Sequence, residues 1–326
     1  MSSDRTADVL PVSIILDTDI GPDCDDAGAL AVLHSLRLQE EVNILAVMHC
    51  TSSPWGAGCV DAINTYYGCG NIPVGSLNRK GFLDDDENYH RYDRYIAMNY
   101  PNKYKYIDQS ASGTVKPEDA VRLYRKLLIN NVGKNITITA IGPLKNLSDL
   151  LLSGPDDISD MRGIDLVRDK ILRLVIMGGC FVADPQDPGY IEAEWNIQMD
   201  ISSAVTVADL WPTPIDFCGF EIGFEIITGK ILLAVSPDDP VRKAYELHTP
   251  GMERYSWDPA TVLYSVRGCG NRWDVSGYGQ VIIDEAGRTK WTAKSGSNHR
   301  YLIRKGYPSA IQSELNGLMQ TGTVLL

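Results

Sequence analysis

Residues 12–30 read VSIILDTDIGPDCDDAGAL. Residues 12–16 are rich in apolar and β-branched side chains, which predicts a buried strand. Small and apolar residues after the aspartate pair predict a helix over 25–36, so the acidic loop lies between a strand end and a helix start. A strand, a loop and a helix in this order are typical of an α/β protein.

The same alternation continues along most of the chain. We expect one open, mostly parallel sheet flanked by helices, because apolar strands alternating with amphipathic helices are typical of that fold. No Gly/Ser-rich or Pro-rich linker divides the chain, so residues 1–326 are expected to form a single domain. Further strands are predicted at 43–49, 72–74, 136–141, 171–177 and 214–218, and further helices at 58–67, 117–129, from 143, and at 202–210.

Composition excludes several classes of function. The 326 residues carry a formal net charge of −12, whereas proteins that bind nucleic acid need a basic surface. No apolar run approaches the ~18 residues needed to span a bilayer, and the N-terminus lacks the apolar segment of a signal peptide. The seven cysteines form no CxxC pair, which favours reduced core thiols and a cytoplasmic protein.

Five aspartates fall within ten residues, between 17 and 26. Carboxylates this close repel one another unless a cation compensates, and oxygen ligands favour Ca²⁺ or Mg²⁺. Helix capping explains one or two of them. An EF-hand would need Gly and Glu where Pro22 and Gly28 stand. A phosphatase with a DxD nucleophile would also need a Lys and further acidic residues at later strand ends, which we cannot assign convincingly.

Four later motifs follow this cluster in order: AIGPLKN at 140–146, VIMGG at 175–179, EWNIQMD at 194–200 and SWDPATVL at 256–263. With DTDIGPDCDDA, they resemble the signature segments of the inosine-uridine-type nucleoside hydrolases across nearly the whole chain. Each motif alone is weak, but five in the expected order make chance a poor explanation. The resemblance implies that the chain is a calcium-dependent enzyme that cleaves the N-glycosidic bond of ribonucleosides and takes part in purine metabolism.

The resemblance also implies a calcium ion at the bottom of the pocket. Asp19, Asp26 and Asp258 would supply carboxylate ligands, and Ile141 would supply a backbone carbonyl. Asp19 would also act as the catalytic general base that accepts a proton from the attacking water. The transition state would resemble an oxocarbenium ion, whose positive charge the surrounding carboxylates would stabilise.

The substrate-binding residues implied by the resemblance surround the ribose and the base. Asp25, Glu194 and Asn196 would hydrogen-bond the ribose, and Met177 would lie beneath the sugar. Ser53 stands near the position where the family often has an Asn that faces the substrate.

Two departures from the family pattern affect these assignments. Two extra residues precede the Asp25–Asp26 pair, so Asp23 could replace Asp25 at the ribose or join the metal ligands. Trp257 stands where nonspecific members carry a His that protonates the leaving base. It would either stack on a base, which would favour purines, or simply pack the pocket wall.

The motifs therefore do not identify the acid that would protonate the leaving group. His90 and the tyrosines of residues 82–106 are the candidates that the sequence offers. That segment is either an exposed connection or a mobile lid over the ligand.

Two alternatives to a nucleoside hydrolase remain. One is a hydrolase of another N-riboside, because the departures concern the base-binding side. The other is a noncatalytic ribose-binding protein of the same fold that retains calcium. By analogy with the family, we expect a homo-oligomer, either a dimer or a tetramer.

Overall fold

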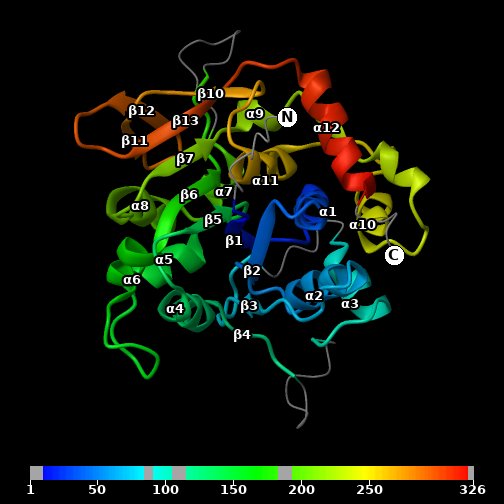
Figure 1. The fold of residues 1–326 in the computed structure, drawn as a ribbon, viewed down its shortest axis with the longest axis horizontal. Coiled ribbons are helices and arrows are strands. Elements are labelled where there is room, and N and C mark those ends of the chain that lie inside the picture. The colour runs from blue at the N-terminus through cyan, green and yellow to red at the C-terminus, as the bar shows by residue number, and fades with distance from the viewer. Residues whose placement is uncertain (1–9, 84–90, 105–114, 183–192, 322–326) are drawn as a thin grey trace, which may run out of the picture.

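A computed structural model describes residues 10–83, 91–104, 115–182 and 193–321 (Figure 1). In this part of the chain, the main sheet has the strand order β12-β11-β13-β7-β6-β5-β1-β2-β3-β4, with β10 paired to β13. Strands β1 to β7 pair in parallel, whereas β10, β11 and β12 add antiparallel pairs. The predicted α/β fold with an open, mostly parallel sheet is confirmed.

The bounds of the elements follow the chain order. The strands are β1 Val12–Thr18, β2 Val42–His49, β3 Val74–Ser76, β4 Glu118–Asp119, β5 Ile136–Ala140, β6 Ile171–Met177, β7 Ile215–Cys218, β8 Ile227–Thr228, β9 Arg254–Tyr255, β10 Trp273–Val275, β11 Gly279–Ile283, β12 Thr289–Ala293 and β13 His299–Arg304. The helices are α1 Asp25–Leu38, α2 Gly56–Tyr66, α3 Asp93–Asn99, α4 Ala120–Asn130, α5 Lys145–Leu152, α6 Gly163–Lys170, α7 Trp195–Met199, α8 Ile201–Leu210, α9 Phe220–Gly223, the 3₁₀ helix η1 Lys230–Ala234, α10 Pro240–His248, α11 Trp257–Arg267 and α12 Pro308–Thr321.

Helices cover both faces of the sheet, and each face has its own apolar core. On one face, Ile14 and Leu16 of β1 pack with residues of α1, α2, α10, α11 and α12. On the other face, Ile15 of the same strand packs with residues of α4, α5, α6 and α8. Figure 1 shows these two groups of helices on opposite sides of the central strands. Adjacent side chains of a strand point to opposite faces, so a strand buried on both sides must be apolar throughout.

Most predicted elements of the parallel sheet match the structure. The strand predicted at 171–177 is β6, but the strand predicted at 72–74 begins two residues later, as β3. The antiparallel strands β10 to β13 were not predicted from the sequence. They are short and carry partly exposed, polar side chains, so they lack the apolar runs that marked the parallel strands.

The segment 82–106 is only partly described, since 84–90 and 105–106 lie outside the described residues. Within the described part, Tyr92, Asp93 and Ile96 are buried, and α3 packs against α2. Tyr92 donates a hydrogen bond from its hydroxyl to the carbonyl of Asp23, at 2.9 Å. Part of residues 91–104 is therefore packed against the protein, beside the acidic loop, while Tyr95 and Met98 of α3 remain exposed.

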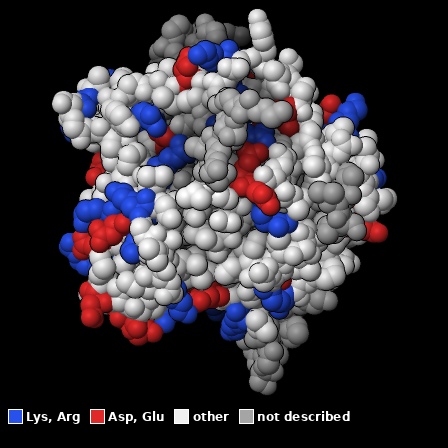
Figure 2. Space-filling model, in the orientation of Figure 1, with Lys and Arg blue, Asp and Glu red and all other residues white. Residues whose placement is uncertain are grey.

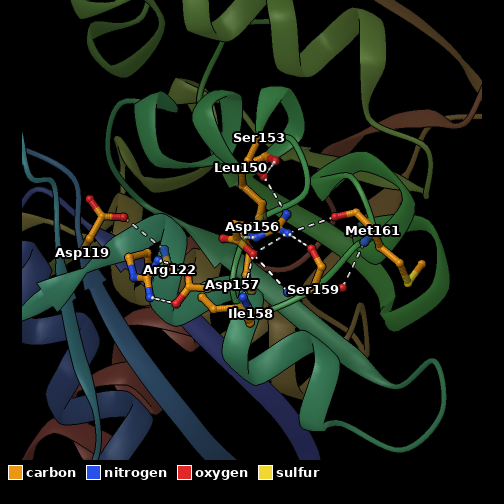
Figure 3. Close-up of polar contacts among 10 residues, drawn as sticks. Asp119, Arg122, Leu150, Ser153, Asp156, Asp157, Ile158, Ser159 and Met161 are labelled. Atoms are coloured by element: carbon orange, nitrogen blue, oxygen red, sulfur yellow. Dashed lines mark hydrogen bonds and ion pairs between the residues drawn. The ribbon is translucent and has the colours of Figure 1, made fainter.

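A buried arginine fixes the connection between α5 and α6. Arg125, only 1% exposed, donates to both carboxylate oxygens of Asp156 at 2.8 and 2.9 Å, and to the Ser153 hydroxyl at 3.0 Å. The guanidinium also donates to the carbonyls of Ser159 and Met161, each at 2.9 Å. Figure 3 shows Ser153, Asp156, Ser159 and Met161 of this connection with their polar contacts. One side chain of α4 therefore satisfies several polar groups of the loop at once.

Loss of this side chain should destabilise the protein strongly. We expect Arg125→Ala to lower the free energy of unfolding by about 3 kcal/mol, because the loop keeps polar groups that have lost their donor. Urea unfolding followed by circular dichroism measures this. Arg122→Ala is the control, because Arg122 pairs with Asp157 at the exposed surface and its removal should barely move the midpoint. Equal effects of the two changes would contradict the expectation.

None of the described helices is long and apolar enough to cross a bilayer. Figure 2 shows one face of the molecule, on which the acidic and basic side chains of the described residues form adjacent small clusters.

Candidate active site

The chain reverses its direction across the sheet at β1, which lies between β2 and β5. Ligands of open α/β sheets bind at such a point, outside the carboxyl ends of the strands. A cavity of about 570 Å³ opens there, lined by residues that follow β1, β5 and β7 and by the end of β6. The predicted site residues that line it are Asp19, Asp25, Asp26, Ile141, Met177, Glu194, Asn196, Trp257 and Asp258.

Three carboxylates from the two ends of the chain meet in this cavity. Asp25 and Asp26 begin α1, Asp258 lies in the first turn of α11, and one oxygen of each lies within 4.8 Å of the others. The backbone N–H of Asp258 donates to the Asp25 carboxylate at 3.1 Å, and the Thr18 hydroxyl donates to Asp26. The two helix starts therefore hold the acidic groups together although 233 residues separate Asp25 from Asp258.

Burial makes the charged form of these groups costly. Burial and the neighbouring carboxylates raise the pKa values of Asp25, Asp26 and Asp258 well above the usual aspartate range. Asp19 is 8% exposed, and burial raises its pKa to about 7. The Glu194 pKa is likewise raised to about 7 by burial. A group of carboxylates in this state is suited to hold a cation.

The five clustered aspartates have different surroundings. Asp17 points to the opposite face of the sheet, where it accepts hydrogen bonds from Tyr124 at 2.8 Å and from Asn146 at 3.2 Å. The Asp23 carboxylate accepts from the Nε of Arg254 at 2.9 Å. Asp17 therefore lies outside the cavity lining, whereas Asp23 lines the cavity but is neutralised by an arginine.

Glu194 and Asn196 form a rigid wall of the cavity. The Glu194 carboxylate accepts from the backbone N–H groups of Gly179, Asn196 and Ile197, at 2.9 to 3.2 Å. The Asn196 side-chain amide donates to the Ile141 carbonyl at 3.3 Å and to the Met177 carbonyl at 3.2 Å. These bonds tie α7 to the ends of β5 and β6.

A glycine allows the loop after β5 to approach the acidic loop. A Cβ atom on Gly142 would lie 2.8 Å from both the backbone nitrogen and the Oδ1 of Asp19. Since no side chain fits there, Gly142 lets Ile141 and Asp19 line the same cavity.

Trp257 lies in an aromatic wall. Its ring centroid is 5.4 Å from that of Phe220 and 5.3 Å from that of Tyr255, and its indole N–H donates to the Phe220 carbonyl at 2.8 Å. The guanidinium carbon of Arg254 lies 5.1 Å from the Trp257 ring centroid. The ring is thus fixed in orientation beside the cavity, with its N–H already used.

Ser53 is not among the described residues that line the cavity. It is buried, and its hydroxyl donates to the Asp93 carboxylate at 2.7 Å, while Arg91 donates to the same carboxylate oxygen at 3.2 Å. A direct contact of Ser53 with a ligand is therefore not supported by this arrangement. His90, a candidate acid, lies outside the described residues.

Comparison with protein families agrees with this geometry. The family model of the inosine-uridine preferring nucleoside hydrolases matches residues 14–297. The chain belongs to this nucleoside hydrolase family. Comparison with curated proteins gives no match.

Solved structures with the nucleoside hydrolase fold resemble the chain over almost its whole length. An inosine-uridine preferring nucleoside hydrolase from Bacillus anthracis has a TM-score of 0.68 at 18% identity, covering 95% of this chain and 99% of that one. An inosine-guanosine nucleoside hydrolase has a TM-score of 0.65 at 16% identity, with coverages of 95% and 98%. The type III effector protein XopQ complexed with adenosine diphosphate ribose has a TM-score of 0.65 at 16% identity, with coverages of 97% and 94%. At these identities the likeness establishes the fold.

The sequence did not predict several residues that line the cavity of this nucleoside hydrolase family member. Phe220 follows the carboxyl end of β7, so the rule that sites lie at strand ends could have indicated it. Trp195, 46% exposed, stands inside the EWNIQMD motif. His248 and Arg254 carry no local signal, because tertiary packing alone brings them to the cavity.

Proposed function

We propose that this chain is a calcium-dependent nucleoside hydrolase that cleaves the N-glycosidic bond of ribonucleosides to give a free base and ribose. One observation carries the proposal: Asp25, Asp26 and Asp258 converge in a single cavity that Asp19 also lines. Membership of the nucleoside hydrolase family supports it.

The donor atoms of this cavity fit a calcium ion. As the family resemblance implies, Asp19, Asp26 and Asp258 would hold the ion through carboxylate oxygens and Ile141 through its carbonyl, since Ca²⁺ prefers six to eight oxygen ligands. The three carboxylates with oxygens within 4.8 Å of one another are Asp25, Asp26 and Asp258, and Asp19 lines the same cavity. The raised pKa values of these aspartates reflect buried negative charge that a divalent cation would compensate. When bound, the ion would supply positive charge that lowers the pKa of a water molecule. It would also bind adjacent ribose hydroxyls.

The side chains of the cavity would have separate roles in the reaction. Asp19 lines the cavity and would accept a proton from the attacking water. Asp25 and Asn196 would hydrogen-bond the ribose hydroxyls, with Met177 beneath the ring. Glu194, held by three backbone N–H groups, would place negative charge near the ribose as positive charge grows on it. The rigid wall would keep the sugar in position for attack.

Release of ribose tests the function directly. We expect the protein to liberate reducing sugar from at least one of inosine, adenosine, guanosine, cytidine and uridine, and EDTA to abolish this activity until excess Ca²⁺ is added. Failure to release ribose from any of the five, with calcium bound, would refute the nucleoside hydrolase proposal.

The stabilising effect of calcium should depend on pH. Without metal, the folded state holds protons on aspartates whose pKa burial raises, to about 7 for Asp19, whereas the unfolded chain titrates near 3.8. The metal-free fold is therefore most stable at low pH and loses stability as the pH rises through about 7, while calcium must displace those protons. At free calcium of 100 times the Kd, we expect about 2.7 kcal/mol of stabilisation at pH 8. One retained proton would reduce this to about 0.9 kcal/mol at pH 5.5.

Thermal melts with calcium and with EDTA at the two pH values measure this difference. Magnesium is the control, because Mg²⁺ requires a near-ideal octahedral geometry, whereas Ca²⁺ accepts six to eight ligands in a flexible arrangement. A calcium effect that is equal at both pH values would contradict a site built from these aspartates.

The aromatic wall suggests a preference for purines. If Trp257 stacks on the base, Trp257→Ala should raise the KM for inosine about 10-fold, since an aromatic contact contributes about 0.5–1.5 kcal/mol beyond its burial. The KM for uridine should rise less, because a pyrimidine offers a smaller ring. Initial-rate kinetics with both nucleosides measure the ratio. If the KM values for inosine and uridine change equally, or if neither changes, Trp257 only packs the pocket wall.

A second candidate is a ribose-binding protein that does not hydrolyse its ligand. The structure that favours it is XopQ, which has this fold and was solved with adenosine diphosphate ribose. Isothermal titration with ribose and adenosine diphosphate ribose, under conditions where no ribose is released from nucleosides, would support this candidate. Release of free adenine from adenosine diphosphate ribose would instead indicate a hydrolase of another N-riboside, because cleavage of its N-glycosidic bond frees the base.

A further inference from the structure

A histidine that the sequence did not single out lies at the cavity, next to the acidic loop. His248 is the last residue of α10, and both His248 and Asp23 line the cavity. The His248 Nε2 is 3.4 Å from the Asp23 Oδ1, and the two side chains are 19% and 28% exposed. The imidazole is thus partly buried, faces a carboxylate and remains in reach of solvent.

The surroundings of His248 stabilise positive charge on its ring. The Asp23 carboxylate attracts the imidazolium, and the last turn of a nine-residue helix favours a cation through the helix dipole. Arg254 opposes it but is itself paired with Asp23. The Cys24 thiol, which lies within 4.8 Å of the same group, stays neutral because burial raises its pKa well above the usual range.

Side-chain contacts connect His248 to Trp257, the residue proposed to face the base. Asp23 joins His248 to Arg254, and Arg254 in turn lies over Trp257 in the aromatic wall. The carboxylates proposed to hold the ribose begin α1 and α11. Trp257 itself has no acidic proton near neutral pH, and its indole N–H is bonded to Phe220.

We propose that His248 is the catalytic acid that protonates the departing base, with Asp23 as its positioning residue; this rests on the proposed hydrolase function. As the bond between the ribose C1′ and the base nitrogen breaks, its electron pair goes to the base, and the protonated imidazole gives a proton to another nitrogen or oxygen of the base. Water adds its oxygen to C1′ and gives a proton to Asp19. Solvent then reprotonates His248 and takes the proton from Asp19, so the net reaction consumes one water.

Two substrates with different leaving groups test this role. We expect His248→Asn to lower kcat for inosine about 10²–10⁴-fold, the usual contribution of a general acid. For p-nitrophenyl riboside the loss should be at most about 10-fold, because p-nitrophenolate delocalises its charge and leaves without a proton. The fall of kcat for inosine at high pH, caused by loss of the imidazolium proton, should disappear in the variant.

Controls separate this role from a structural one. His248→Gln is a second variant, and the calcium-induced rise in melting temperature reports an intact site. His299→Gln should keep the ratio of the two kcat values within about threefold, because His299 lies in β13 and bonds the backbone N–H of Val281. Equal losses on both substrates, or no loss on inosine, would overturn the assignment. If the wild-type protein releases ribose from none of the five nucleosides, the proposed function itself fails.

Discussion

Replacement of Asp19 by Asn should lower kcat for nucleoside hydrolysis about 10²–10⁴-fold while the protein still folds. The amide keeps the size of the carboxylate but cannot accept the proton of the attacking water. Asp19 is nearly buried in the cavity, where its carboxylate would take the proton that the amide cannot accept. Initial rates with saturating inosine and calcium measure the effect.

Asp17→Asn is the matched control for that experiment. Asp17 is two residues earlier, but it faces Tyr124 and Asn146 on the other side of the sheet. Its replacement should leave kcat within about threefold of the wild type. Near-normal turnover in Asp19→Asn would refute the general-base role, and an equal loss in both variants would indicate a general effect on the fold.

Replacement of Asp258 by Asn should produce two opposite changes in stability at pH 8. The metal-free protein should melt at a higher temperature than the wild type, because one buried carboxylate that repels Asp25 and Asp26 is gone. The calcium-induced stabilisation, about 2.7 kcal/mol in the wild type at 100 times its Kd, should be nearly lost. Thermal melts with EDTA and with calcium measure both changes.

Asp23→Asn is the control for Asp258→Asn, because it removes an acidic group of the cavity that is not proposed to bind the metal. Asp23 lines the same cavity but is paired with Arg254, so this variant should keep most of the calcium effect. If Asp258→Asn retains the full calcium response, or if Asp23→Asn loses it, the assignment of the ligands is wrong.

Local patterns predicted the part of the fold that consists of buried strands. An apolar run such as residues 171–177 specifies a strand covered on both faces without any knowledge of its neighbours, and it is β6. Strands β10 to β13 lack such runs, because they pair at the sheet edge and keep polar side chains in contact with water. Their pairing depends on contacts with distant segments, which a local pattern does not record.

The sequence by itself determined the family motifs, their order and the concentration of aspartates where β1 ends. Apart from the family resemblance, it could not assign separate roles to those aspartates, because the role of a carboxylate depends on its neighbours in space. Asp17 is bonded to Tyr124, 107 residues away, while Asp25 meets Asp258, 233 residues away. The place of His248 beside Asp23 was likewise decided only by tertiary packing, because α10 returns to the acidic loop through contacts with α1, α2 and α3.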